Sequence, residues 1–161
     1  MGSPLGPALA NIYMVTLEQE LIPKLTTQMC GWKRYVDDTL AYVKSEEIPN
    51  ILEELNSYDH RIQFTHEIAK DNCIPFLDVL ISWKDDKYQM KVHRKETHND
   101  LYIHWETQAP IKWKTSTLKG LVRRAFKICS NEQYLKTELR HLKRVFHSES
   151  GYPIWFIDKV I

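Results

Sequence analysis

The sequence contains few cysteines and no long apolar run, and each shortage excludes a class of protein. The three cysteines, Cys30, Cys73 and Cys129, are far apart and odd in number, and none belongs to a CxxC pair. We therefore interpret them as reduced thiols of an intracellular protein. No stretch approaches the roughly 18 apolar residues of a membrane helix, and no signal peptide opens the chain, so we expect no membrane partner. A nuclear location is compatible with this interpretation, although the sequence shows no targeting signal.

Acidic residues are scarce in the last third of the chain. Residues 105–161 carry 11 Lys and Arg but only 5 Asp and Glu, a net of +6, whereas residues 1–104 carry 11 and 16, a net of −5. Together they give the formal net charge of +1. An acidic part followed by a basic part suggests a cation-binding or neutral core joined to a module that faces a polyanion. A solvated helical surface is the alternative.

Internal repeats and low-complexity segments are also absent. The 43% hydrophobic and 27% charged residues are typical of one globular domain or two small subdomains.

Helical spacing predicts a first helix that starts near Pro7 and is ended by Pro23. β-forming residues around two aspartates predict a hairpin over 32–43, and a second helix is expected over 45–58, capped by Ser45. The apolar face of the first helix comprises Leu9, Ile12, Tyr13, Leu17 and Leu21.

Strand patterns continue after residue 60. Alternating apolar residues predict strands over 61–69, 74–84 and 86–95, with a turn at Asp85 and Asp86 between the last two.

Near Thr115 the apolar period becomes helical. This change predicts helices over 115–130 and 131–146 and a short third helix behind Gly151 and Pro153. Strands followed by helices are typical of an α+β fold, which is the fold class we predict.

Two adjacent aspartates, Asp37 and Asp38, lie at the turn of the predicted hairpin. Carboxylates suit Mg²⁺, and two such ions about 4 Å apart can clamp the attacking and leaving oxygens of a displacement at phosphorus. Successive side chains of a strand point to opposite faces, so this kind of site needs carboxylates from more than one strand. The alternative is an Asp-Asp turn that faces solvent.

The surrounding sequence resembles a known family. The opening "GSPLGPALANIYM" and the later "YVDD" resemble motifs B and C of the reverse transcriptase palm, especially in the Penelope-like class of retroelements. The blocks "IQFTHE", "IPFLDVLI", "VHRKETHNDLYIHW", "LVRRAFKICS", "ELRHLKRVF" and "GYP" follow in the family's order, so the resemblance covers essentially the whole chain.

The resemblance implies three parts with different roles. Residues 1–83 would form a partial polymerase palm, an antiparallel sheet with helices. Residues 84–110 would form a connecting hairpin similar to a primer grip, and residues 111–161 a small, basic helical thumb with a helix-turn-helix-like bundle. The parent enzyme would be an RNA-directed DNA polymerase that uses Mg²⁺, deoxynucleotides and an RNA or DNA template–primer.

The same resemblance assigns roles to residues of the first part. Asp37 and Asp38 would be catalytic metal ligands, and Tyr35 would lie beneath the primer end. A loop against the templating base and the incoming nucleotide would comprise Gly2, Ser3, Pro4, Gly6 and Pro7. Glycine suits this place because a base pair must lie close to the backbone.

One departure from the family pattern limits the expected activity. The family's first catalytic aspartate lies upstream of motif B, and nothing precedes Met1. None of Asp59, Asp78, Asp85 and Asp86 matches that motif. We therefore expect a fragment that is inactive alone. We also expect it to be poorly soluble, because the missing strand would leave a sheet edge open.

The basic tail supplies the second predicted site. Cations recur at three- and four-residue spacing opposite the apolar stripe of each predicted helix, which suits contacts with phosphates. The resemblance implies that they grip the template–primer. They are Lys119, Arg123, Arg124 and Lys127 in the first helix and Lys136, Arg140, Lys143 and Arg144 in the second.

The histidines and aromatic residues carry weaker signals. The spacing of His93, His98 and His104 near Cys73 matches no zinc-finger pattern. The aromatic residues Tyr102, Trp105 and Trp113 could stack on bases, but packing in the core is the expected role of such residues.

Three hypotheses remain open at the level of the sequence. The chain is a fragment of an active polymerase, a remnant that binds nucleic acid through its basic helices without catalysis, or an unrelated α+β domain in which the two aspartates only form a turn.

Overall fold

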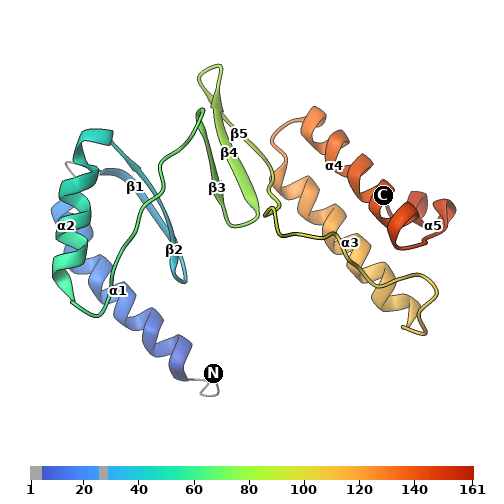
Figure 1. The fold of residues 1–161 in the computed structure, drawn as a ribbon, viewed down its shortest axis with the longest axis horizontal. Coiled ribbons are helices and arrows are strands. Elements are labelled where there is room, and N and C mark those ends of the chain that lie inside the picture. Colours follow the sequence, from blue (N-terminus) through green and yellow to red (C-terminus); the bar gives the residue numbers. More distant parts are fainter. Residues whose placement is uncertain (1–4, 26–28) are drawn as a thin grey trace. The chain divides into compact units, whose positions relative to one another are not determined.

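A computed structural model describes residues 5–25 and 29–161. The chain divides into two compact units, Met1–Ile68 and Ala69–Ile161, and each is considered by itself. Both contain helices and antiparallel strands, which confirms the predicted α+β class (Figure 1). The boundary between the units falls at residue 68, whereas the functional division at residues 83 and 110 stays a prediction.

The first unit is a hairpin with two helices. The elements are α1 (Leu5–Leu25), β1 (Met29–Tyr35), β2 (Asp38–Val43), a 3₁₀ turn η1 (Ser45–Glu47) and α2 (Ile48–Tyr58). In Figure 1, α1 and α2 lie side by side. Their packing creates an aliphatic core of Leu17, Leu21, Leu25, Met29, Ile51 and Leu55.

Helix α1 uses only part of its predicted apolar face. Leu17 and Leu21 are buried, but Leu9 and Ile12 are each 61% exposed. The prediction that Pro23 ends the helix is wrong by two residues. The helix continues to Leu25, whose side chain is buried in the core.

Two further predictions for this unit are wrong for physical reasons. Ser45 starts the 3₁₀ turn before α2 and does not cap the helix, whose N-cap is Glu47. Residues 61–69 form no strand. The side-chain amide of Asn56 donates to the carbonyl of Phe64 (3.2 Å) and accepts from its N–H (2.6 Å), so it occupies the place of a neighbouring strand.

The second unit begins with a three-stranded antiparallel sheet in the order β3–β4–β5. The strands are β3 (Cys73–Phe76), β4 (Val79–Lys84) and β5 (Lys87–Val92). The single strand predicted over 74–84 is therefore divided by a two-residue turn at Leu77 and Asp78. The predicted turn at Asp85 and Asp86 is confirmed, and both residues have a positive φ, as a type I′ hairpin turn requires.

Three helices and a π-helical turn complete this unit. They are α3 (Ile111–Ile128), α4 (Glu132–Arg144), η2 (Val145–Glu149) and α5 (Ile154–Val160), so the three predicted helices are confirmed and the first starts four residues earlier than expected. Their buried residues form a core rich in aromatic rings: Leu118, Val122, Leu142, Phe146, Tyr152, Phe156 and Ile157.

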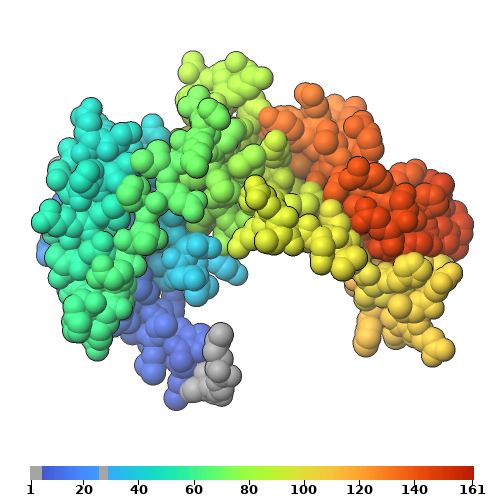
Figure 2. Space-filling view, in the orientation of Figure 1, coloured from blue at the N-terminus to red at the C-terminus, as the bar shows by residue number. Residues whose placement is uncertain are grey.

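The segment before α3 completes this core. The rings of Tyr102 and Phe146 stack at 5.0 Å, and Trp105 lies 4.9 Å from Phe156. In Figure 2 the yellow segment and the red C-terminal helices lie against each other. Gly151 makes this fit possible, because it has a φ of +71° and a Cβ there would lie 3.1 Å from the ring of His104.

Candidate functional site

The tip of the β1–β2 hairpin carries the two predicted metal ligands. Tyr35 pairs with Asp38, so Val36 and Asp37 form a two-residue turn. Asp37 and Asp38 are exposed, and their side chains make no hydrogen bond or ion pair with any residue in 5–25 or 29–161. Tyr35 is 61% exposed beside them. The structure therefore brings these three predicted residues together at one surface.

A glutamate of α1 holds the hairpin from one side. Glu18 accepts from Arg34 Nε at 2.7 Å and Nη2 at 3.2 Å, and from Trp32 Nε1 at 2.8 Å. Burial raises the pKa of Glu18, but the hydrogen bonds from Arg34 and Trp32 outweigh it, and the pKa lies below its ordinary value. Sequence reasoning missed this anchor. Its signal was the placement of Trp32 and Arg34 on alternate positions of one strand.

This anchor determines which way the tip faces. Because Trp32 and Arg34 face α1, the alternation of a strand directs Tyr35 to the opposite face. Asp38 is directly opposite Tyr35 in the register, so its side chain lies on that same face, away from α1.

The turn itself has an unusual backbone. Val36 has a φ of 58°, a region that β-branched residues rarely adopt. Arg34 Nη1 donates to the Val36 carbonyl at 3.0 Å and so supports this conformation. Such local strain is concentrated at functional sites of proteins.

Two carboxylates are fewer than a two-ion Mg²⁺ site needs. Within the described ranges, no group of three or more His, Cys, Asp or Glu side chains could hold a metal ion. The donor type fits Mg²⁺, but the described residues do not complete a site. Gly6 and Pro7 belong to the first turn of α1 and not to a loop, which corrects that expectation. Gly2, Ser3 and Pro4 lie outside the described residues.

Helix α3 carries a row of free cations. Lys119, Arg123 and Lys127 are four residues apart, are all exposed, and form no ion pair within the described residues. We call these three residues the α3 ridge. They lie on the exposed side of the helix, as predicted from the sequence. Arg124 differs, because it is half-buried and pairs with Asp78 at 3.2 Å.

Helix α4 presents a second, partly neutralised row. Lys136, Arg140 and Arg144 are exposed at the same four-residue spacing, and we call them the α4 ridge. Lys136 pairs with Glu132 at 2.7 Å. Lys143, predicted to belong to this row, is half-buried and pairs with Asp158 at 2.6 Å.

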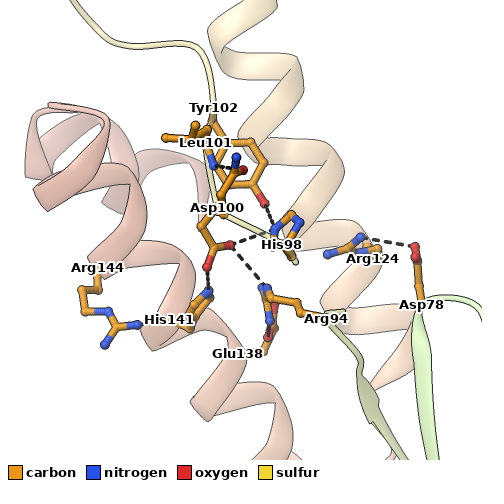
Figure 3. A network of polar contacts seen from close by, with 11 residues as sticks. Asp78, Arg94, His98, Asp100, Leu101, Tyr102, Arg124, Glu138, His141 and Arg144 are labelled. Carbon is orange, nitrogen blue, oxygen red and sulfur yellow. Dashed lines mark hydrogen bonds and ion pairs between the residues drawn. The ribbon is translucent and has the colours of Figure 1, made fainter. Parts of the chain in front are cut away.

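A polar network fixes α4 to the segment after β5 (Figure 3). Arg94 binds Glu138 through two nitrogens, at 2.8 and 2.5 Å. Asp100 lies 3.1 Å from His98 Nε2, 3.0 Å from His141 Nε2 and 3.4 Å from Arg94 Nε. The hydrogen bonds that Arg94 donates to Glu138 raise the pKa of the guanidinium despite its partial burial.

The network also acts on Asp100. Burial raises the pKa of this carboxyl, but His141, Arg94 and His98 together outweigh that effect and lower it. On the other side of the core, the buried Lys114 amine donates to the carbonyls of Trp105 and Thr107. Both features hold the helices in place without using the cations of the two ridges.

The histidines and aromatic residues noted in the sequence have different environments in the structure. His98 binds Asp100, and His104 lies against Gly151. Tyr102 and Trp105 pack on the aromatic core, whereas Trp113 is 61% exposed.

Residues 101–161 match the family model described as animal helix-turn-helix domain. The match covers the segment before α3 and all three helices of the second unit. No curated protein and no solved structure matches the chain. None of the helices within residues 5–25 and 29–161 combines the length and apolar character needed to cross a membrane.

Proposed function

We propose that the second unit binds nucleic acid through the α3 and α4 ridges. The observation that carries this proposal is the α3 ridge: three exposed cations at one-turn intervals, with no acidic partner within the described residues. Four residues of helix rise about 6 Å, so the ridge places three positive charges along about 12 Å. The match to an animal helix-turn-helix domain supports the proposal, since such modules place a helix against a duplex.

The chemistry of the two ridges favours phosphate over base recognition. Lysine and arginine side chains on a solvated helix face position a protein on the backbone without reading sequence. Ion pairs within the protein occupy Arg124, Lys136 and Lys143, so the α3 ridge supplies the larger share of free charge. We expect affinity that depends strongly on salt and weakly on sequence.

The salt dependence of binding tests this function. Affinity of the 161-residue chain for a labelled duplex is measured between 50 and 300 mM salt, conditions we choose so that the slope is well defined. Replacing Lys119, Arg123 and Lys127 by alanine should reduce the slope by about 3. The control removes the same charge from the first unit at Lys24, Lys33 and Lys44, all exposed, and should leave the slope nearly unchanged. Equal losses in both variants would show a non-specific charge effect and overturn the proposal.

A second function is supported by the hairpin tip. We propose that Asp37 and Asp38 supply two of the metal ligands of an RNA-directed DNA polymerase of the Penelope-like type, completed by sequence outside this chain. The supporting observation is the pair of exposed, unneutralised carboxylates on a hairpin oriented by Glu18. In such an enzyme Mg²⁺ would support template-directed nucleotidyl transfer from deoxynucleotides.

Primer extension with the upstream polymerase piece supplied in trans tests this second function. Asp37→Asn and Asp38→Asn should each abolish extension. The β4–β5 turn offers a matched control, because Asp85 and Asp86 are also adjacent and exposed at a two-residue hairpin turn. Extension that survives Asp37→Asn, or that is lost equally in Asp85→Asn, would contradict the assignment.

A further inference from the structure

One aromatic side chain lies within the α3 ridge. Phe126 is 57% exposed and makes no ring–ring or cation–π contact with any described residue. It follows Arg123 by three residues and precedes Lys127 directly. At about 100° per residue, its Cα lies about 20° around the helix from that of Lys119 and about 60° from that of Arg123, so the ring flanks the row of cations.

The core of the second unit does not explain this position. The buried apolar residues of α3 are Leu118, Val122 and Ala125, and Phe126 lies at the edge of that side, about 80° around the helix from Leu118, with its side chain exposed. Phe126 is absent from the aromatic core, whose rings come from η2, α5, the connection between them and the segment before α3. An exposed ring of this size leaves a large apolar area in water, and burial against a ligand would remove that cost.

We propose that Phe126 stacks on an unpaired base whose flanking phosphates contact the α3 ridge. This inference rests on the proposed nucleic-acid binding and adds a substrate class: a single strand, or a single-stranded segment beside a duplex. A ring beside a row of cations suits such a ligand, because bases offer faces for stacking while the phosphates follow the charges. In a continuous duplex the faces of the bases are covered by their neighbours. Phe126 therefore favours unpaired over paired strands.

The same helix provides a matched control. Trp113 is also an exposed aromatic of α3, at 61%, but it lies in the first turn of the helix, six residues and about 9 Å before Lys119. Loss of this ring removes a similar exposed apolar surface without touching the ridge. Any effect specific to the ridge must therefore distinguish Phe126→Ala from Trp113→Ala.

The test compares a 12-nucleotide oligo-dT, a 12-nucleotide oligo-U and a duplex of random sequence in titrations of the full 161-residue chain. Phe126→Ala should weaken binding of the single strands about tenfold and leave duplex binding within about twofold. The salt slope should stay unchanged, since no phosphate contact is lost. Phe126→Trp should restore single-strand affinity, and Trp113→Ala should behave as the unmodified chain. The two single strands distinguish RNA from DNA as the preferred source of bases.

The outcomes separate this inference from the function on which it rests. If the unmodified chain binds no strand at any salt concentration, the proposed binding function itself fails. If it binds with a steep salt slope but Phe126→Ala binds single strands as well as before, the stacking role alone is overturned. Equal weakening of single-strand and duplex binding by Phe126→Ala would also overturn it. Circular dichroism of each variant confirms that the helices are intact.

Discussion

Each of the two compact units contains one arginine–glutamate pair that joins a helix to a strand or to the segment after a strand. The two pairs differ in the core that lies beside them. Arg34 and Glu18 join β1 to α1 beside a small aliphatic core. Arg94 and Glu138 join the segment after β5 to α4 beside a core of stacked aromatic rings. The comparison suggests that the first pair mainly orients the hairpin tip, whereas the second mainly adds stability to helices already fixed by packing.

The largest expected effects are in the two cores. Phe146→Ala should destabilise the second unit by about 4 kcal/mol, and Leu17→Ala should destabilise the first by about 3 kcal/mol, because both side chains are fully buried. Native-state hydrogen exchange measures the two units separately. Phe146→Ala should accelerate exchange in α3 and α4 and leave the slowest amides of α1 unchanged. A uniform acceleration would show that the two cores unfold as one.

The arginine–glutamate pairs come next in size. Glu138→Ala should cost about 2–3 kcal/mol, because it leaves a largely buried arginine with only Asp100 as a charged partner. Glu18→Ala should cost about 2 kcal/mol, since Arg34 keeps its bonds to Val36 and Asn11. Urea titration gives both values.

The control for these variants is Glu132→Ala, which removes the exposed pair with Lys136 and should cost less than about 0.5 kcal/mol. Glu18→Ala should in addition weaken any activity that depends on Asp37 and Asp38, because the hairpin loses its anchor. A Glu18→Ala variant with unchanged metal-dependent activity would contradict the orienting role.

The sequence predicted the elements whose pattern is local. The hairpin at Asp37 and Asp38, the turn at Asp85 and Asp86 and the three C-terminal helices follow from spacing and turn residues, and the structure contains all of them. The exposed cations of α3 follow in the same way, because the apolar stripe of an amphipathic helix determines which side remains in water.

Features that depend on tertiary contacts were not predictable from the pattern. Residues 61–69 alternate like a strand, but a side-chain amide of α2 satisfies Phe64, and no spacing rule anticipates such a partner. The division of 74–84 depends on Leu77 with a φ of 53°, a residue that gives no turn signal. Likewise, nothing in the sequence marks Arg124 as the cation that pairs with Asp78.

In each unit, a carboxylate with a lowered pKa contributes to stability, and this contribution depends on the pH. In the second unit the pKa of Asp100 is lowered, because His141, Arg94 and His98 outweigh the effect of burial. In the first, the pKa of Asp59 lies well below its ordinary range, chiefly through Arg61 and also through the Tyr13 hydroxyl. Because each folded pKa is below the unfolded value, each contribution is complete above about pH 4 and is lost as the pH falls through the folded pKa.

Asparagine substitution removes this dependence one unit at a time. Asp100→Asn should cost about 1 kcal/mol at pH 7 and flatten the acid limb of stability for the second unit only. Asparagine tolerates the positive φ of 53° at this position, so the backbone is not strained by the change. Asp59→Asn should flatten the acid limb of stability for the first unit only. Stability is followed by hydrogen exchange between pH 2 and 7, a range we choose to include the upper part of the transition below about pH 4, and an unchanged acid limb in either variant would contradict the assignment.

The smallest expected effects concern the two hairpin turns in which an apolar residue has a left-handed backbone conformation. Val36 has a φ of 58° and Leu77 a φ of 53°, and each is the first residue of a two-residue turn. The left-handed conformation costs a non-glycine residue about 1–2 kcal/mol, whereas glycine adopts it freely but loses more entropy on folding. Val36→Gly should therefore stabilise the first unit by about 0.5 kcal/mol, and Leu77→Gly should gain less, because leucine is not β-branched and is only 40% exposed. Urea titration gives the free energy of unfolding of each variant. Asparagine at each position is the control, since it relieves the strain without the additional loss of backbone entropy that glycine suffers on folding. If Val36→Gly destabilises the hairpin while Val36→Asn does not, the entropy of glycine outweighs the strain, and the valine is less strained than its φ suggests.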